Sequence, residues 1–267
     1  MNRLDELRRE VEETQVLVFA GGLGKRMGLI NKPKPLLEVN GKPLIDICLN
    51  YFKSCGFKNF ILLVGYKHEL IEEYVGDGSK YGIKVKYSVD PPLPKVGRGK
   101  ALKHAVETGI VDRKQRAVVT YPDDIFLDPM LPLKLLLHHL EGVKLRRIKA
   151  TAVFASAIDY PYGVGEVDEN NIVLSFKEKP VIKILTSTGL YAIEPEVFDL
   201  VVETVDMNAE KAVDLENLIL PILAKKKQLY ALIIPKDVWI PVNTIKDLEK
   251  ASKVVASLES SINSRQD

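Results

Sequence analysis

The sequence predicts an α/β protein of three layers, in which a mixed, mainly parallel central sheet lies between two layers of helices. Segments 16–20, 60–64 and 117–121 are apolar and uncharged, as in strands that are buried on both faces of a sheet. Segments with apolar residues at helical spacing, such as 43–53 and 100–108, stand between them. This alternation favours parallel strands whose connecting helices cover both faces of the sheet.

The other elements follow from the same patterns. Residues 163–167 and 172–177 flank the turn-forming sequence Asp-Glu-Asn-Asn, which predicts a hairpin in the second half of the chain. Apolar residues at helical spacing predict helices, and short apolar runs predict strands. These helices are expected at 1–14, 69–75, 132–140, 196–202, 214–225 and from 245 to about 257, and these strands at 84–88, 150–157, 188–193 and 229–234.

The composition excludes several classes of protein. Of 267 residues, 46% are hydrophobic and 28% are charged, which is ordinary for a globular protein with a sizeable core. Lys and Arg number 38 and Asp and Glu 36, and this balance argues against nucleic acid or a membrane surface as the main partner. The first 14 residues form no apolar leader and two cysteines are too few for a disulfide framework, so we expect a cytoplasmic protein.

A glycine-rich loop directly follows the first predicted strand. The sequence Gly21-Gly22-Leu23-Gly24-Lys25-Arg26 places backbone N–H groups and two cations where ligands bind in open α/β sheets. A dinucleotide-binding loop would begin a helix at once, which the prolines of Lys32-Pro33-Lys34-Pro35 prevent. A Walker A loop would require Ser or Thr where Arg26 stands. The alternative is a tight turn with solvated basic residues, and by itself a loop of this kind favours neither interpretation.

The following segments decide between these interpretations. Six motifs occur in order: GGLGKRM with NKPKPLLEVNGKPLID, GRGKAL at 97–102, YPDDIF at 121–126, YGV at 162–164 with FKEKP at 176–180, STGLY at 187–191, and WIPVNT at 239–244. Together they resemble the sugar-1-phosphate nucleotidylyltransferases, over most of residues 15–252. The resemblance implies a Rossmann-like, GT-A-like fold. It also implies transfer of a nucleotide from an NTP to a sugar 1-phosphate, with release of pyrophosphate.

The resemblance also implies roles for individual residues. Because two anions must meet, catalysis would depend on cations and positioning, supplied by Arg26, Lys34 and Asp123. The residues expected to bind the nucleotide are Ala20, Gly21, Gly22, Gly24, Lys25, Gly97, Gly99 and Lys100. Those expected to bind the sugar phosphate are Asp124, Gly163, Glu178, Lys179 and Thr188. Asp124 has an equally weighted alternative, a side chain that caps a turn.

Magnesium is the expected cofactor, with Asp123 as its first ligand. A carboxylate at the end of a buried strand, next to a second carboxylate, is costly unless a cation compensates it. Many members of the family carry a second aspartate at the position of Pro241, which has no ligand atom in its side chain. Asn243 offers an amide oxygen and is the expected replacement, with Asp237 as the fallback.

The expected organisation is one nucleotidyltransferase domain over 15–258, preceded by a helix at 1–14 and followed by a frayed tail at 259–267. Its nucleotide half would cover about 15–125, its sugar half about 126–244 and a C-terminal helix 245–258. The segment with Gly97, Gly99 and Ala101 resembles that of uridylyl- and thymidylyltransferases, and this resemblance implies UTP or dTTP with a hexose 1-phosphate. The N-terminal helix is available for contact within a homo-oligomer.

Two alternatives to this function stay open. One is nucleotidyl transfer to a non-sugar phosphate, of the phosphocholine or molybdenum-cofactor type. The other is a sensor that binds nucleotide sugars without turnover, which the proline at 241 keeps open. The histidines show no metal-ligand spacing, and His139, near the end of a predicted helix, is expected at the surface.

Overall fold

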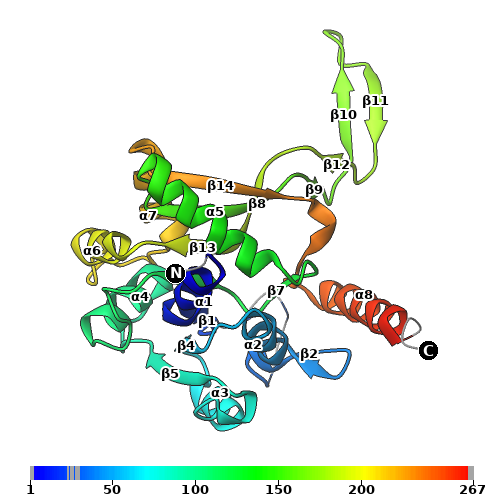
Figure 1. Ribbon diagram of the computed structural model, residues 1–267. Helices are drawn as coiled ribbons and strands as arrows, with labels where there is room; N and C mark the ends of the chain where they lie inside the picture. The colour runs from blue at the N-terminus through cyan, green and yellow to red at the C-terminus, as the bar shows by residue number, and fades with distance from the viewer. Residues whose placement is uncertain (1–2, 23, 25–26, 28–30, 264–267) are drawn as a thin grey trace.

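The computed structural model describes residues 3–22, 24, 27 and 31–263. A seven-stranded sheet forms its centre, in the order β14-β8-β13-β6-β1-β4-β5 (Figure 1). Strands β1, β4, β5 and β6 run parallel, β13 is antiparallel to both of its neighbours, and β14 is parallel to β8. The predicted mixed, mainly parallel sheet is therefore confirmed. Its strands are β1 Gln15–Phe19, β4 Asn59–Val64, β5 Lys84–Val89, β6 Ala117–Thr120, β8 Ala150–Ala155, β13 Thr186–Ile193 and β14 Leu229–Ile234.

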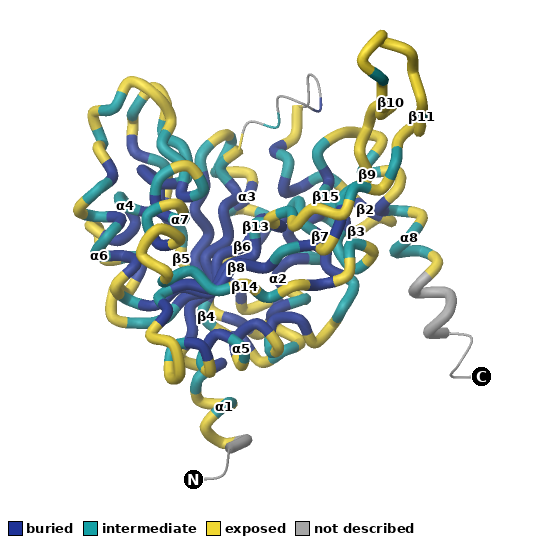
Figure 2. The backbone as a smooth tube through the Cα atoms, turned by 90° about the horizontal axis from the view of Figure 1, so that it is seen from above, coloured by how far each residue is buried: buried dark blue, intermediate teal, exposed yellow. Residues whose placement is uncertain are grey.

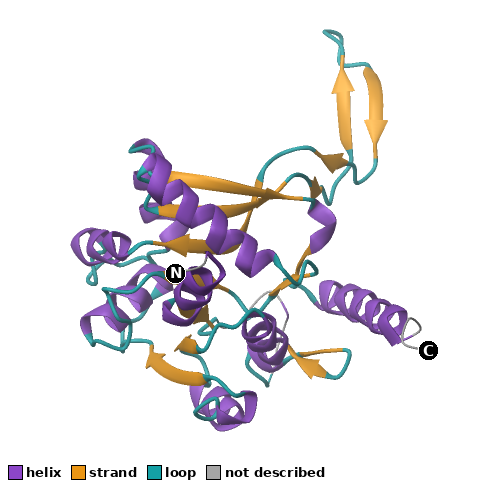
Figure 3. Cartoon of the chain, viewed as in Figure 1, coloured by secondary structure: helices purple, strands orange, loops and turns teal. Residues whose placement is uncertain are grey.

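Helices cover the two faces of this sheet (Figure 3). Alternate residues of a strand point to opposite faces, and so Val16 and Val18 of β1 pack on one side and Leu17 and Phe19 on the other. The first side packs against α1 Arg3–Glu13, α2 Leu44–Ser54, α3 His68–Val75 and α5 Leu131–Arg146. The second side packs against α4 Gly97–Glu107, α6 Pro195–Thr204 and α7 Leu215–Lys225. The buried core follows the sheet in Figure 2.

Several short elements were not predicted. Strand β7 Asp124–Phe126 pairs antiparallel with β15 Trp239–Pro241, and β2 Glu38–Val39 pairs with β3 Lys42–Pro43. A small apolar cluster fixes these elements against α8 Ile245–Asn263. The β7–β15 pair matters for function because it brings the segment after Trp239 next to the end of β6 (residues 117–120).

The predicted hairpin is present and projects from the body of the molecule (Figure 1). It consists of β10 Val164–Val167 and β11 Val173–Lys177. The side chain of Asp168 holds its turn by accepting hydrogen bonds from the backbone N–H groups of Asn170 and Ile172 at 2.9 and 2.8 Å. A two-strand ladder at its base pairs β9 Ile158–Asp159 with β12 Val181–Ile182. Both strands of the hairpin are largely exposed in Figure 2.

The expectation for His139 is wrong, because this side chain is fully buried. Its ring bonds to the Thr151 hydroxyl at 2.9 Å and to the Glu194 carboxylate at 3.0 Å. Glu194 also accepts a hydrogen bond from Arg116, which pairs in turn with Glu10 of α1. The apolar spacing of the helix could not show this network, since its partners come from distant parts of the chain. Among the described helices, none combines the length and apolar character needed to cross a bilayer.

Candidate functional site

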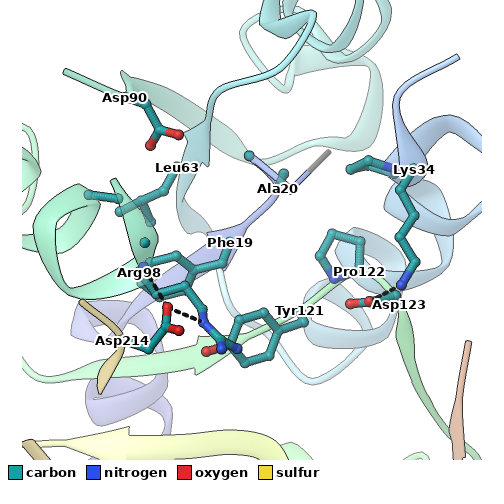
Figure 4. Close-up of a pocket in the computed structure, with 15 residues that line it drawn as sticks. Phe19, Ala20, Lys34, Leu63, Asp90, Arg98, Tyr121, Pro122, Asp123 and Asp214 are labelled. Atoms are coloured by element: carbon teal, nitrogen blue, oxygen red, sulfur yellow. Dashed lines mark hydrogen bonds and ion pairs between the residues drawn. The ribbon is translucent and has the colours of Figure 1, made fainter. Parts of the chain in front are cut away.

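A cavity of about 320 Å³ lies at the carboxyl ends of the parallel strands. Leu63 near the end of β4 and residues that follow β1, β5 and β6 meet there, because parallel strands end at the same edge of a sheet. Figure 4 shows Lys34 and Asp123 on one side of it and Asp90, Leu63 and Arg98 on the other. The described residues that line it are Phe19, Ala20, Gly21, Gly22, Lys34, Pro35, Leu63, Asp90, Gly97, Arg98, Ala101, Tyr121, Pro122, Asp123 and Asp214.

Lys34 and Asp123 form an ion pair at one end of this cavity. Their side chains are 15% and 28% exposed, so both are accessible to a ligand without being fully solvated. Prolines on both sides restrict the backbone of Lys34. Pro33, with φ −62°, immediately precedes the short 3₁₀ helix Lys34–Leu36. The lysine is therefore held in place beside the carboxylate.

Asp124 accepts a hydrogen bond from the Trp239 indole Nε1 at 2.8 Å. Burial and then the neighbouring charge of Asp123 raise its pKa well above the usual value. The protonated form of Asp124 is thereby favoured over the ionised form.

These residues fit a magnesium ion. The Val242 N–H donates to the Asp123 carbonyl at 2.7 Å, which puts Asn243 on the segment that passes Asp123. A carboxylate and an amide oxygen are ligands of the kind Mg²⁺ prefers, and the ion commonly completes its shell with water and substrate phosphates. The described residues contain no cluster of three acidic, histidine or cysteine ligands, so such substrate oxygens would be required. The fallback residue Asp237 is 84% exposed and pairs with Lys236.

The N-terminus of α4 forms a second wall of the cavity. Gly97 has φ +69°, and a Cβ there would lie 2.6 Å from the carbonyl oxygen of Val213. Gly99 donates its N–H to the same oxygen at 2.7 Å, and its missing Cβ allows this close approach. Both glycines are thus required by the packing of residue 213 against the helix, whatever else they contact.

Arg98 lies between these glycines and is held by two carboxylates. Its Nε lies 3.0 Å from Asp214 Oδ1, and its Nη1 lies 3.3 Å from Glu216 Oε1. The guanidinium also stands over the Tyr121 ring, 5.2 Å from the centroid, and the Tyr121 hydroxyl donates to Glu216 at 2.8 Å. Phe19 stacks on Tyr121 with 5.6 Å between ring centroids, and this gives the cavity a flat aromatic floor.

Asp90 follows β5 and carries a carboxylate at the other end of the cavity. An ideal Cβ on Gly21 would lie 3.1 Å from Asp90 Oδ2, and one on Gly65 would lie 2.3 Å from it. Burial raises the pKa of Asp90 to about 6, although the nearby His68 acts in the opposite direction. The two glycines therefore leave room for this side chain at the strand ends.

The structure brings together many of the residues expected at the site. Six of them line the cavity: Ala20, Gly21, Gly22, Lys34, Gly97 and Asp123. Gly24 lies next to Lys34, since a Cβ on it would be 3.5 Å from that of the lysine. Lys25 and Arg26 lie outside the described residues, and their roles stay predictions.

Two expected positions need correction. Lys100 is 1% exposed and donates to the carbonyl of Ala209 at 2.6 Å, so its side chain points into the core and away from the cavity. Thr188 is equally buried, and its hydroxyl donates to the carbonyl of Val153 at 3.0 Å. The position of Lys100 on α4 sets the direction of its side chain, and the position of Thr188 on β13 of the central sheet sets the direction of the other.

The predicted sugar-phosphate residues of the hairpin stand apart from the cavity. Glu178 and Lys179 are 62% and 68% exposed and pair with each other at 3.8 Å. The ring of Phe176 covers Gly163, where a Cβ would meet it at 2.4 Å. The cavity lining includes none of the three.

A second cavity of about 390 Å³ lies on the side of Trp239, at the foot of the hairpin. Ile158 and Asp159 of β9 face it across from Pro241 and Asn243. Asp159 accepts from Lys236 at 2.7 Å and lies 3.7 Å from Lys250. Trp239 lines this cavity and donates a hydrogen bond to Asp124, the residue that follows Asp123.

Sequence reasoning missed Asp90, Arg98, Tyr121 and Asp214 as lining residues. Asp90 carried a usable signal, because it follows a predicted parallel strand as Asp123 does. No feature of the sequence indicated Asp214. It reaches the cavity because residue 213 packs against the N-terminus of α4, where Asp214 accepts a hydrogen bond from the Arg98 N–H.

Comparison with known proteins places these observations in a family. The family model described as nucleotidyl transferase matches residues 15–257. A D-glycero-alpha-D-manno-heptose 1-phosphate guanylyltransferase from Campylobacter jejuni is 35% identical over 191 residues, which cover 69% of this chain and 78% of that protein. A UTP–glucose-1-phosphate uridylyltransferase from Synechocystis is 28% identical over 266 residues, covering 92% of this chain and 64% of that protein. The chain thus spans under two thirds of the length of the second relative.

Solved structures share the fold. One from Bacillus anthracis, assigned as a glucose-1-phosphate thymidylyltransferase, superposes with a TM-score of 0.69 at 23% identity, covering 90% of this chain and 94% of that one. HddC from Yersinia pseudotuberculosis superposes with a TM-score of 0.63 at 21% identity, covering 91% and 99%. At these identities the likeness concerns the fold alone.

Proposed function

The chain belongs to the nucleotidyl transferase family, and on this premise we propose that it transfers a nucleoside monophosphate from an NTP to a sugar 1-phosphate, releasing pyrophosphate. The observation that carries the proposal is the pair of Lys34 and Asp123 at the carboxyl edge of the sheet, in a cavity lined by Gly21 and Gly22. An NTP would lie across the strand ends, with its phosphates toward this pair.

The reaction needs no general base. The second pKa of a phosphate monoester is about 6, so the attacking sugar-phosphate oxygen is ionised at pH 7. That oxygen forms a bond to the α-phosphorus while the bond to the bridging oxygen of pyrophosphate breaks. Lys34 offsets the charge that the two anions bring together, and its fixed backbone limits the loss of entropy on binding. Arg26 and Lys25 are proposed to hold the leaving pyrophosphate.

Asp123 and Asn243 are the residues that would hold Mg²⁺. When bound, the ion supplies positive charge for the phosphates in the transition state. Lys34 pairs with Asp123 in the structure, and its ammonium would lie close to the phosphate oxygens of an NTP if this carboxylate held a divalent cation. The neutral side chain of Asn243 keeps the total ligand charge low, so metal binding would depend on the NTP.

The acceptor would enter from the side of Trp239. The second cavity lies there. Asn243 lines it, and Trp239, which also lines it, donates a hydrogen bond to Asp124. Lys179 and Glu178 would bind the sugar phosphate if the hairpin approached this region. Relatives act on heptose and glucose 1-phosphates, and both kinds of acceptor are candidates.

The test is release of pyrophosphate. The protein is incubated with Mg²⁺, each of GTP, UTP, dTTP, CTP and ATP, and a panel of hexose and heptose 1-phosphates. Release with at least one pair, lost in Asp123→Asn, supports the proposal. Release with phosphocholine alone would favour the non-sugar acceptor, and nucleotide binding without release for any acceptor would favour a sensor.

A further inference from the structure

The Asp90 carboxylate lies at the cavity without a hydrogen-bond donor among the described residues. Its oxygen rests against the glycine backbone at 21 and 65, which leaves no side chain on that side. Leu63, Gly97 and Ala101 line the same cavity and offer apolar surface to a flat ring. A half-buried carboxylate of this kind is costly unless a ligand donates hydrogen bonds to it.

The strand order puts Asp90 at the far end from the phosphates. Asp123 follows β6, Gly21 follows β1, Gly65 follows β4 and Asp90 follows β5, and these strands are consecutive in the sheet. Three steps of about 4.8 Å separate the first strand from the last, or roughly 14 Å. In an NTP the ribose lies next to the phosphates and the base lies beyond it. The end marked by Asp90 therefore fits the base (Figure 4).

We propose that Asp90 is a specificity-determining residue that recognises the guanine base of GTP. The inference rests on the proposed function and names its nucleotide. Guanine presents two adjacent donors, N1–H and the exocyclic N2–H₂, which match the two oxygens of one carboxylate. Uracil and thymine present one donor between two acceptors, and adenine and cytosine place an acceptor next to their amino group. Each of these would leave a carboxylate oxygen facing an acceptor.

This proposal differs from the expectation of UTP or dTTP. That expectation followed from the resemblance of the glycine segment at 97–101, but Gly97 and Gly99 are required by their contact with Val213. Their small size therefore carries no information on the base. The remaining competitor is a ribose diol, which also offers two donors to Asp90, and the experiment must separate it from the base.

The experiment compares GTP with xanthosine triphosphate (XTP). XTP carries a carbonyl oxygen where GTP has the amino group, so it suits an amide and not a carboxylate. Binding of both nucleotides, with UTP and dTTP, is measured by calorimetry on the wild-type protein and on Asp90→Asn. We expect Asp90→Asn to lose GTP affinity by about 10- to 100-fold and to gain XTP affinity by a similar factor. Asp5→Asn, an exposed change of the same chemistry on α1, is the matched control and should alter neither.

A gain in XTP affinity by Asp90→Asn would distinguish loss of base recognition from loss of folded structure. Circular dichroism of the variant checks its folding independently. Equal loss of GTP, XTP and UTP in Asp90→Asn would overturn the proposal and indicate a ribose or structural role. Preference of the wild-type protein for UTP or dTTP would overturn it as well, while leaving the proposed transfer intact. GTP binding with the XTP switch but without pyrophosphate release would support Asp90 and reject the proposed transfer instead.

Discussion

The proposed nucleotide side and the proposed sugar side of the molecule are built in different ways. On this nucleotide side, Gly21, Asp90 and Asp123 follow parallel strands β1, β5 and β6 of one sheet, and its hydrogen bonds fix their separations. On the sugar side, Glu178 and Lys179 follow a two-stranded hairpin that projects from the body. Its β11 residues Leu174 and Phe176 are 66% and 67% exposed, so little packing holds it against the rest of the chain.

This difference indicates which groups are held in position before a ligand binds. A site at the strand ends exists before the ligand binds, since no backbone needs to move to bring its groups together. Glu178 and Lys179 are exposed and do not line the first cavity, so the proposed contact with a sugar phosphate there would require the hairpin to approach it. Changes on the nucleotide side should therefore affect the chemical step, and changes on the sugar side should affect acceptor binding.

The largest expected effect is at the ion pair of the nucleotide side. Lys34→Ala should lower kcat by about 10²- to 10³-fold, because it removes a fixed cation from the reacting phosphates. Lys32→Ala is the matched control, since that lysine is half exposed and pairs with Glu38. Steady-state rates of pyrophosphate release measure both. Equal loss in the two variants would mean that general positive charge matters and not the position of Lys34.

A smaller effect, confined to the acceptor, is expected on the hairpin. Lys179→Ala should raise the KM for the sugar 1-phosphate by about 10- to 100-fold, through loss of a charged hydrogen bond, with the KM for NTP unchanged. Lys177→Ala, an exposed lysine two residues earlier, should leave both constants unchanged. A normal KM in Lys179→Ala would show that the hairpin does not serve this acceptor.

The loss of the proposed metal ligand Asn243 should have a smaller effect again. Asn243→Ala should raise the Mg²⁺ concentration for half-maximal rate by about 10-fold, because one neutral ligand is lost. The comparison is Asp237→Ala, at the exposed side chain that is the fallback ligand. A shift in the second variant with none in the first would reverse the assignment.

The network around Glu194 should change stability without changing kinetics. Burial opposes ionisation there, but hydrogen bonds from His139 and Arg116 outweigh it and lower the pKa of Glu194 to about 2. Glu194→Ala should reduce the free energy of unfolding by about 3 kcal/mol, since it leaves buried partners unpaired. Urea denaturation beside steady-state assays measures both effects, and an altered kcat in folded protein would link this network to the site.

The same network fixes the sign of the pH dependence. The folded pKa of Glu194 lies below its ordinary value of 4.5, so the unfolded chain binds this proton more tightly and stability falls between about pH 4.5 and 2. Burial also lowers the pKa of His139 below 6.5, and stability begins to fall below about that pH. Urea denaturation of Glu194→Ala should show a smaller loss below pH 4.5 than the wild-type protein; a parallel loss would place the acid sensitivity elsewhere.

The sequence predicted the central strands well because their apolar runs are buried on both faces. It also located Ala20, Gly21 and Asp123, since the end of a parallel strand can be counted along the chain. It failed for Lys100, where helix position could not show that the side chain turns toward Ala209. It missed β7 and β15, because three-residue strands carry too little pattern, and Asp214, because that contact joins segments more than a hundred residues apart.

The account depends most on chemistry at the Lys34–Asp123 end of the cavity. The most direct measurement follows GTP labelled with ³²P at the α-phosphate, incubated with Mg²⁺ and the panel of sugar 1-phosphates. The account predicts that the label appears in a nucleotide sugar with one equivalent of unlabelled pyrophosphate, and that Asp123→Asn loses this transfer while remaining folded. Label retained in GTP for every acceptor, or undiminished transfer in Asp123→Asn, would contradict it.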